Sequence, residues 1–198
     1  DTQTDNTGLA VFTDNCSTPT VSYTDNVTTV DCPNYYIFER RFVATDACGN
    51  ATSKDQIITV VDTTPPSLIT PANKTVECSA STLPAATGTA TGSDTCGSVA
   101  ITYTDAEVKG CGNTKTITRT WKATDACGNF SESTATFTIE DTTNPTITAA
   151  SDETVECDGA GNTAALNAWL ANYGGATASD VCSGVTWSNN FTSLSDDC

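Results

Sequence analysis

The sequence contains no histidine and no methionine, and its 198 residues include only 8 lysines and arginines against 24 acidic residues. Without histidine it can build neither a Ser-His-Asp triad nor another site that needs an imidazole base. It also has no GxxxxGK loop of the kind that holds phosphate groups. These absences lead us to expect that the protein is not an enzyme.

The formal net charge of −16 excludes two classes of partner. Nucleic acids and anionic membrane surfaces attract patches of lysine and arginine, which this composition cannot supply. The longest apolar runs also fall short of the roughly 18 residues that a membrane-spanning helix needs. We therefore expect no nucleic-acid binding and no membrane insertion.

What the sequence does contain is ten cysteines. They form no CxxC pair, and no histidine is available to complete a zinc site. Cysteines at repeated positions are typical of a disulfide framework in an oxidising compartment. The sequence therefore predicts a secreted, extracellular or cell-surface protein.

A strict period of 79 residues orders the chain. The heptapeptide ATDACGN occurs at Ala44–Asn50 and at Ala123–Asn129, and the linkers DTTPP and DTTNP begin at Asp62 and Asp141. Such a period marks a tandem array. We expect three repeats: residues 1–61, which lack their N-terminal part, the complete repeat 62–140, and residues 141–198, which lack their C-terminal strands.

Forty threonines and stretches of alternating apolar and polar residues predict β-strands. In TKTITRTWKATD, residues 114–125, one face carries Ile117, Arg119 and Trp121. The matching stretch of the first repeat places Arg40 beside Phe42. An inward-facing arginine has to pair with a carboxylate or stack on an aromatic ring, and we expect a structural role through stacking on Trp121 or Phe42. Each DACGN reads as the turn of a hairpin, and the regular turns predict an all-β sandwich.

The third repeat departs from the pattern, because Cys157 and Cys182 are 25 residues apart where Cys78 and Cys96 are 18 apart. The extra stretch, GNTAALNAWLANYGG, predicts a short helix at about residues 162–173. Two roles are open for it: a helical lid that packs on the edge of the sandwich, or a ligand platform built on Trp169.

Together, the aromatic residue before AxDxxGN, the hairpin, the alternating strand and the DTTPP linker resemble the hyalin-repeat (HYR) type of immunoglobulin-like domain. The version with cysteines, SDTCG followed by CGNTKTITRTWKATDACGN, is similar to tandem repeats of very large secreted surface proteins of gliding, Bacteroidota-type bacteria. The resemblance covers essentially the whole chain. It implies immunoglobulin-like sandwiches, an adhesin-like or filament-forming role, and no enzymatic activity.

An immunoglobulin-like sandwich would bring SDTCG and DACGN together at one end, and VEC and CGNTKT at the other. The resemblance thereby implies the disulfides Cys16–Cys48, Cys78–Cys111, Cys96–Cys127 and Cys157–Cys198. In this scheme Cys32 and Cys182 have no partner within their own repeats, and they stay thiols or pair with each other or with another chain. Four cysteines allow three pairings in a repeat, and the residues alone leave all three open.

The same arrangement would gather aspartates where two repeats join, as in the joints of cadherin-type and bacterial adhesin domains that calcium stiffens. Calcium takes roughly six to eight oxygen ligands, which clustered carboxylates supply. The alternative is that each aspartate caps its own turn through backbone N–H groups. The candidate calcium ligands are Asp62, Asp94 and Asp125, then Asp141 and Asp180, and in the first repeat Asp14 and Asp46.

Two functions are consistent with these features. The first is a rigid, disulfide-stapled spacer in an extracellular adhesin, stalk or filament, whose partners are neighbouring repeats and other copies of the chain. The second is a carbohydrate- or surface-binding module that uses the loops at the ends of the sandwich or the helix around Trp169. We expect the first, because the strict repeat and the short proline-containing linkers suit a spacer.

Overall fold

A computed structural model describes residues 7–32 and 35–191 of the chain. Strands predominate in this part, and they form several separate sheets, which confirms the prediction of a mostly β protein with disulfides. Among the described residues, none of the helices has the length and apolar character that crossing a membrane requires.

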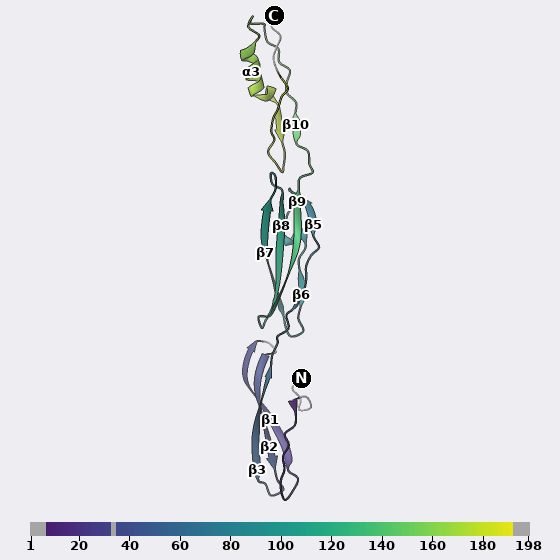
Figure 1. The fold of residues 1–198 in the computed structure, drawn as a ribbon, viewed down its shortest axis with the longest axis vertical. Coiled ribbons are helices and arrows are strands. Elements are labelled where there is room, and N and C mark those ends of the chain that lie inside the picture. Colours follow the sequence, from purple (N-terminus) through teal and green to yellow (C-terminus); the bar gives the residue numbers. More distant parts are fainter. Residues whose placement is uncertain (1–6, 33–34, 192–198) are drawn as a thin grey trace. The chain divides into compact units, whose positions relative to one another are not determined.

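The first sheet is antiparallel and consists of β1 (Thr20–Cys32), β2 (Tyr35–Thr45) and β3 (Ala51–Val60), with β2 in the middle (Figure 1). Phe38, Arg40, Phe42 and Ala44 of β2 are buried at alternate positions, and the residues between them are more exposed. The alternation predicted from the sequence is therefore confirmed, since successive side chains of a strand point to opposite faces.

The second sheet has the order β5-β9-β8-β7 (Figure 1). Its strands are β5 (Lys74–Glu77), which runs parallel to β9, and β7 (Val99–Lys109), β8 (Lys115–Asp125) and β9 (Phe130–Glu140). Ile117 of β8 packs with Ala135, Phe137 and Ile139 of β9 in an apolar cluster that Val76 of β5 borders. The three cluster residues of β9 occupy alternate positions of the strand, as the sequence predicted.

Two short antiparallel pairs complete the strands, and they occupy matching places in the second and third sequence repeats. β4 (Ser67–Ile69) pairs with β6 (Thr91–Ser93), and β10 (Thr146–Thr148) pairs with β11 (Thr177–Ser179). The strands of the first pair approach so closely that a Cβ atom on Gly92 would lie 2.7 Å from the Ser67 carbonyl oxygen. Glycine therefore fits there and a larger residue does not.

Helices are short. The turn α2 (Pro84–Thr87) follows β5, and α3 (Thr163–Ala171) with the 3-10 turn η1 (Tyr173–Gly175) lies in the extra stretch of the third repeat. The helix predicted at about residues 162–173 is confirmed.

The chain divides into two compact units, which do not follow the sequence repeats. One comprises Asp1–Thr70, Ala90–Thr104 and Thr120–Thr134, and the other comprises Pro71–Thr89, Asp105–Arg119 and Ala135–Cys198. The predicted domain boundaries at the two linkers therefore stay predictions. Below, "repeat" refers to the sequence repeats only.

A buried arginine holds β8 to its neighbours. The side chain of Arg119 is 1% exposed, and its Nε and Nη2 atoms donate to the two carboxylate oxygens of Asp105 over 2.7 and 2.8 Å. Its guanidinium also donates to Thr87 Oγ1 (3.0 Å) and to the Thr82 carbonyl (2.9 Å), which ties α2 and its approach to the sheet. This paired and bonded charge offsets much of the cost of removing an arginine from water.

The first repeat contains the same device. Arg40 of β2 donates to both carboxylate oxygens of Asp25 over 2.7 and 2.8 Å. These bonds hold the pKa of Asp25 below its ordinary value, an effect that partial burial opposes. The expected stacking of these arginines on aromatic rings is confirmed, since Tyr23 and Phe38 lie under the Arg40 guanidinium and Phe137 lies under that of Arg119. Stacking on Phe42 and Trp121 stays a prediction.

We expect Arg119→Ala to lower the free energy of unfolding by about 3 kcal/mol, because it removes one partner of a buried ion pair. Lys122→Ala is the matched control. Lys122 makes a longer 3.4 Å pair with Glu132, and both side chains are largely exposed, so its loss should cost less than about 1 kcal/mol. Urea unfolding measures the free energy of unfolding of both variants, and hydrogen–deuterium exchange measures the protection of β7 and β8. Equal losses of stability in the two variants would contradict the role of Arg119.

Candidate functional site

The cysteines and aspartates of interest gather at two places where sequence repeats meet, which we call the first joint and the second joint. Each joint lies within one of the two compact units. The first joint comprises Cys32, Asp62, Asp94, Cys96 and Cys127. The second joint comprises Glu77, Cys78, Cys111, Asp141 and Cys182.

A disulfide crosses the first joint between Cys32 and Cys127, whose Cα atoms are 5.3 Å apart. Cys32 is the last residue of β1 in the first repeat, and Cys127 lies in the turn between β8 and β9 in the second. The prediction of a Cys96–Cys127 disulfide is therefore wrong. The hairpin tip of one repeat reaches a strand end of the preceding repeat, and a pairing scheme confined to single repeats could not include that contact.

The second joint is crossed by a disulfide between Cys78 and Cys182, with Cα atoms 5.8 Å apart. The predicted Cys78–Cys111 disulfide is therefore wrong as well, and Cys111 is an exposed free cysteine. The two residues do lie at the same end of the repeat, because Cys78 and the stretch 112–114 after Cys111 line one hollow. The next repeat supplies the partner: the Asn113 N–H donates to the Cys182 carbonyl over 2.7 Å.

Neither of the other two predicted disulfides, Cys16–Cys48 and Cys157–Cys198, occurs among the described residues. Cys16 and Cys48, which were expected to pair, are both exposed and free, so that prediction is wrong. Cys157 is exposed and free, and its predicted partner Cys198 lies outside the described residues. Cys32 and Cys182 lack partners within their own repeats, as expected. The fates expected for them, as thiols or bonded to each other or to another chain, are wrong, because each bonds to a cysteine of a different repeat in the same chain.

The repeated DACGN turn is held by its own aspartate. One carboxylate oxygen of Asp125 accepts from the backbone N–H groups of Cys127 (2.9 Å) and Asn129 (2.8 Å), and the other accepts from the Asn129 side-chain amide (2.9 Å). Gly128 has a φ of 91°, a conformation that residues with a side chain rarely adopt. The motif repeats because the turn needs this aspartate, glycine and asparagine in these positions.

Asp46 makes the same three hydrogen bonds in the first repeat, each 2.8 Å long. The bond from the Asn50 side chain contributes most to holding the pKa of Asp46 below its ordinary value. For Asp125, burial raises the pKa, but the donors from Asn129 and the turn outweigh burial and lower it.

All the other predicted calcium ligands cap turns too. Asp14, Asp94 and Asp180 accept from the backbone N–H of the cysteine two residues later, over 3.1, 2.7 and 2.7 Å. Asp62 and Asp141 accept from Thr64 and Thr143 in the linkers, over 3.1 and 3.2 Å. The turn-capping hypothesis is therefore confirmed for each of the seven aspartates.

Only part of the predicted calcium clusters comes together. Oxygens of Asp62 and Asp94 lie within 4.8 Å of each other and of the Cys96 sulfur, and Asp125 is outside this group. At the second joint, Glu77 and Asp141 form a similar group with the Cys182 sulfur, which is already in a disulfide.

The carboxylates of each group do not by themselves complete a calcium site. Calcium prefers roughly six to eight oxygen ligands, whereas each group offers two carboxylates and a sulfur. The carboxylates also have other donors: Glu77 accepts from the hydroxyl and the N–H of Thr142. Calcium at the joints stays a prediction.

Trp169 of α3, the proposed ligand platform, packs within the third repeat. A Cβ atom on Gly174 would lie 2.5 Å from Trp169 Cζ2, so the indole covers this glycine. One edge of the indole borders a hollow of about 500 Å³ that Val155 and Leu166 also line. Nearby, Tyr173 stacks on Trp187 with 4.7 Å between ring centroids. These contacts engage both rings in packing within the third repeat. The lid on the sandwich edge and the ligand platform both stay predictions.

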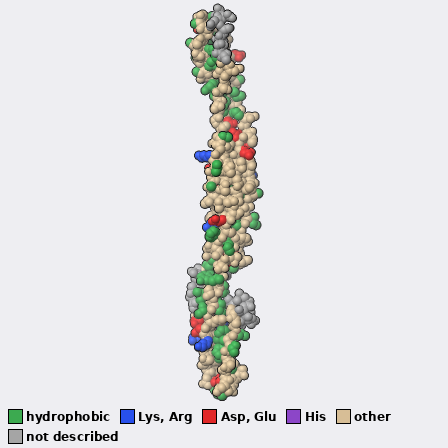
Figure 2. Space-filling model, in the orientation of Figure 1, with side chains coloured by type: hydrophobic (Ala, Val, Ile, Leu, Met, Phe, Trp, Pro, Cys, Tyr) green, Lys and Arg blue, Asp and Glu red, His purple; other side chains and the backbone are tan. Residues whose placement is uncertain are grey.

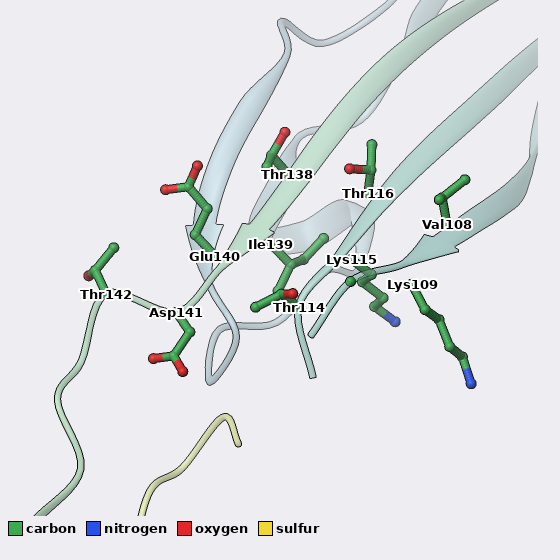
Figure 3. Close-up of a pocket in the computed structure, with 11 residues that line it drawn as sticks. Val108, Lys109, Thr114, Lys115, Thr116, Thr138, Ile139, Glu140, Asp141 and Thr142 are labelled. Carbon is green, nitrogen blue, oxygen red and sulfur yellow. The ribbon is translucent and has the colours of Figure 1, made fainter. Parts of the chain in front are cut away.

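A second hollow, of about 400 Å³, lies at the ends of β7, β8 and β9 next to the second joint (Figure 3). Lys109 and Lys115 project on one side of it, and Glu140 and Asp141 on the other. Lys115 is also paired with Glu107 over 2.6 Å. Because both signs of charge line this hollow, it has no preference for a charged ligand of one sign.

Elsewhere, charge is sparse. On the face drawn in Figure 2, charged side chains are few and scattered among uncharged ones. A comparison of the chain with models of protein families and with curated proteins found no match. The joints, where both described disulfides and most of the capped aspartates lie, are the best-defined candidate functional site.

The Asp125 cap predicts a pH dependence. Its folded pKa lies below the ordinary value of 3.8, so its contribution to stability is fully present above pH 3.8 and is lost as the pH falls through the folded pKa. We expect the carboxyl carbon of Asp125 to titrate below pH 3.8 in an NMR titration, together with the Asn129 amide. In Asp125→Asn that step should disappear while the step of Asp46 remains; titration of Asp125 above 3.8 would contradict the cap.

Disulfide mapping tests the two joints directly. Cleavage before aspartate places all ten cysteines on different fragments, so non-reduced fragments should show Cys32–Cys127 and Cys78–Cys182. Cys32→Ser opens a link across 95 residues and should cost about 4 to 5 kcal/mol in the chain-entropy model. Cys111→Ser is the control and should leave stability unchanged. A Cys96–Cys127 or Cys78–Cys111 fragment pair would contradict the structure.

Proposed function

We propose that this chain is a structural module of an extracellular cell-surface adhesin, stalk or filament, in which each repeat acts as a rigid, disulfide-stapled spacer. The observation that carries the proposal is that both disulfides join one sequence repeat to the next. A bond within a repeat would stabilise that repeat alone, whereas a bond between repeats also restricts how they move about the linker.

The linkers are restrained in addition by hydrogen bonds. At the first joint, the Asn129 side chain donates to the Asp62 carbonyl over 3.0 Å, and the Ser131 hydroxyl donates to the Pro66 carbonyl over 2.7 Å. Pro66 is buried, and proline has a fixed φ. A linker that is bonded along its length and crossed by a disulfide suits a part that transmits force and resists bending.

We further propose that the strands of each repeat belong to immunoglobulin-like sandwiches of the hyalin-repeat kind, exported to the cell surface. The matching places of β4–β6 and β10–β11, and of the Arg40–Asp25 and Arg119–Asp105 pairs, support a common design for the repeats. Disulfides support an oxidising compartment. That the module is no enzyme stays part of this proposal.

The alternative of a carbohydrate- or surface-binding module has less support. Its strongest feature is the apolar hollow beside Trp169. Because the indole covers Gly174, the ring is engaged in packing, and Tyr173 is engaged with Trp187. We therefore assign the aromatic residues of the third repeat to packing, and the joints to the function.

Small-angle scattering tests the spacer. A compact globule of this length would have a radius of gyration of about 16 Å, and we expect a clearly larger value with little flexibility. Cys32→Ser should become more flexible, whereas Cys111→Ser, which removes an exposed free thiol, should not. A value near 16 Å would contradict the spacer. If the chain becomes flexible only when EDTA removes calcium, its rigidity depends on calcium and not on the disulfides.

A further inference from the structure

The two joints use different cysteines of the repeat. A repeat has four cysteine positions, which we number in chain order. The first position holds Cys78 and Cys157, the second holds Cys16, Cys96 and Cys182, the third holds Cys32, Cys111 and Cys198, and the fourth holds Cys48 and Cys127.

At the first joint, the third cysteine of one repeat bonds to the fourth cysteine of the next. At the second joint, the first cysteine of one repeat bonds to the second cysteine of the next. The two bonds share no position. One joint between two complete repeats could therefore form both of them.

Independent geometry shows that the joints are equivalent. At the second joint, the sulfur of Cys182 lies within 4.8 Å of a carboxylate oxygen of the linker residue Asp141. At the first joint, the sulfur of Cys96 lies within the same distance of Asp62, the matching linker residue. Asp94 and Asp180 cap the two loops identically, over 2.7 Å. The second cysteine of a repeat thus stands in one fixed place, beside the linker that enters its repeat.

The first repeat presents the same loops with no repeat before them in the described chain. Asp14 caps the loop of Cys16, Asp46 caps the loop of Cys48, and the Ala47 N–H donates to the Ser17 hydroxyl over 3.5 Å, which holds the loops together. Both cysteines are exposed and free. They occupy the second and fourth positions. The second position is bonded to the preceding repeat at the second joint, and the fourth position is bonded to it at the first joint.

We propose that the loops of Cys16 and Cys48 form a docking surface for a further repeat of this kind, closed by two disulfides. Cys16 bonds to the first cysteine of the incoming repeat, and Cys48 bonds to its third cysteine. Each bond converts two thiols into one disulfide. The two electrons and two protons pass to a small-molecule disulfide, which leaves as two thiols. A joint between two complete repeats then carries two disulfides, and such an array is covalently continuous beyond its backbone.

A second copy of this chain can act as the incoming repeat, because its Cys157 occupies the first position and is exposed and free. The inference rests on the proposed function of a repeating spacer. It predicts that copies associate head to tail, with the third repeat of one copy on the first repeat of another. Such a heterologous contact does not close on itself, so it generates linear chains.

The test mixes unlabelled and nitrogen-15-labelled full-length chain in a glutathione redox buffer, under native conditions and at high protein concentration. Cleavage before aspartate yields residues 14–24 with Cys16 and residues 152–157 with Cys157 as separate fragments. We expect these fragments to be joined in mixed-isotope pairs, and the non-reducing gel to show a ladder of linked chains.

Cys16→Ser should abolish the mixed-isotope pair that contains Cys157, and Cys16→Ser combined with Cys48→Ser should lower the yield of linked chains by about ten-fold, because a disulfide needs both thiols. Cys111→Ser, at another exposed free cysteine, should leave the yield unchanged and is the matched control. A Cys16–Cys48 bond within one chain, equal effects of the two substitutions, or no linkage between chains would overturn the proposal. If any of these results is obtained while Cys32–Cys127 and Cys78–Cys182 remain bonded, the proposed docking surface is wrong and the proposed spacer function is unaffected.

Discussion

The covalent bond between a strand end of one repeat and a loop of the next is the constraint on which the rest of the structure depends. At the first joint this bond can form only if the hairpin tip between β8 and β9 is held in a defined conformation. The Asp125 carboxylate and the left-handed Gly128 provide that conformation, with the N–H of Cys127 itself bonded to Asp125. The cap and the crosslink therefore act together: the cap positions the sulfur, and the disulfide fixes the tip.

Within the repeats, few apolar residues are buried, and a buried ion pair adds to the interactions that hold the strands together. Arg119 reaches Asp105, Thr87 and the Thr82 carbonyl, so one side chain connects β8, β7 and the approach to α2. In the first repeat, Arg40 pairs with Asp25 in the same way. Domains with small cores commonly need additional crosslinks, which explains why a threonine-rich sheet is combined with so many cysteines.

These features fit a mechanical function better than a chemical one. The joints concentrate the disulfides, the capped turns and the bonded linkers, whereas the hollows near Trp169 and at the end of β8 are lined by side chains already engaged in packing or in ion pairs. A load on such a chain would pass through backbone and disulfides at each joint. Crosslinks of this kind limit both hinge motion and local unfolding, because they reduce the freedom of the open chain.

The sequence by itself determined the strands, the hairpin turns, the helix of the third repeat and the linkers, because alternation and turn chemistry are local properties of the chain. It also identified the cysteine and aspartate positions, since both follow the period. It could not determine the partners of Cys78 and Cys127, because pairing depends on which loops meet in space and four cysteines permit every combination. Only the tertiary structure decided that Cys32 and Cys182 cross the joints, because only there do the ends of neighbouring repeats come within bonding distance.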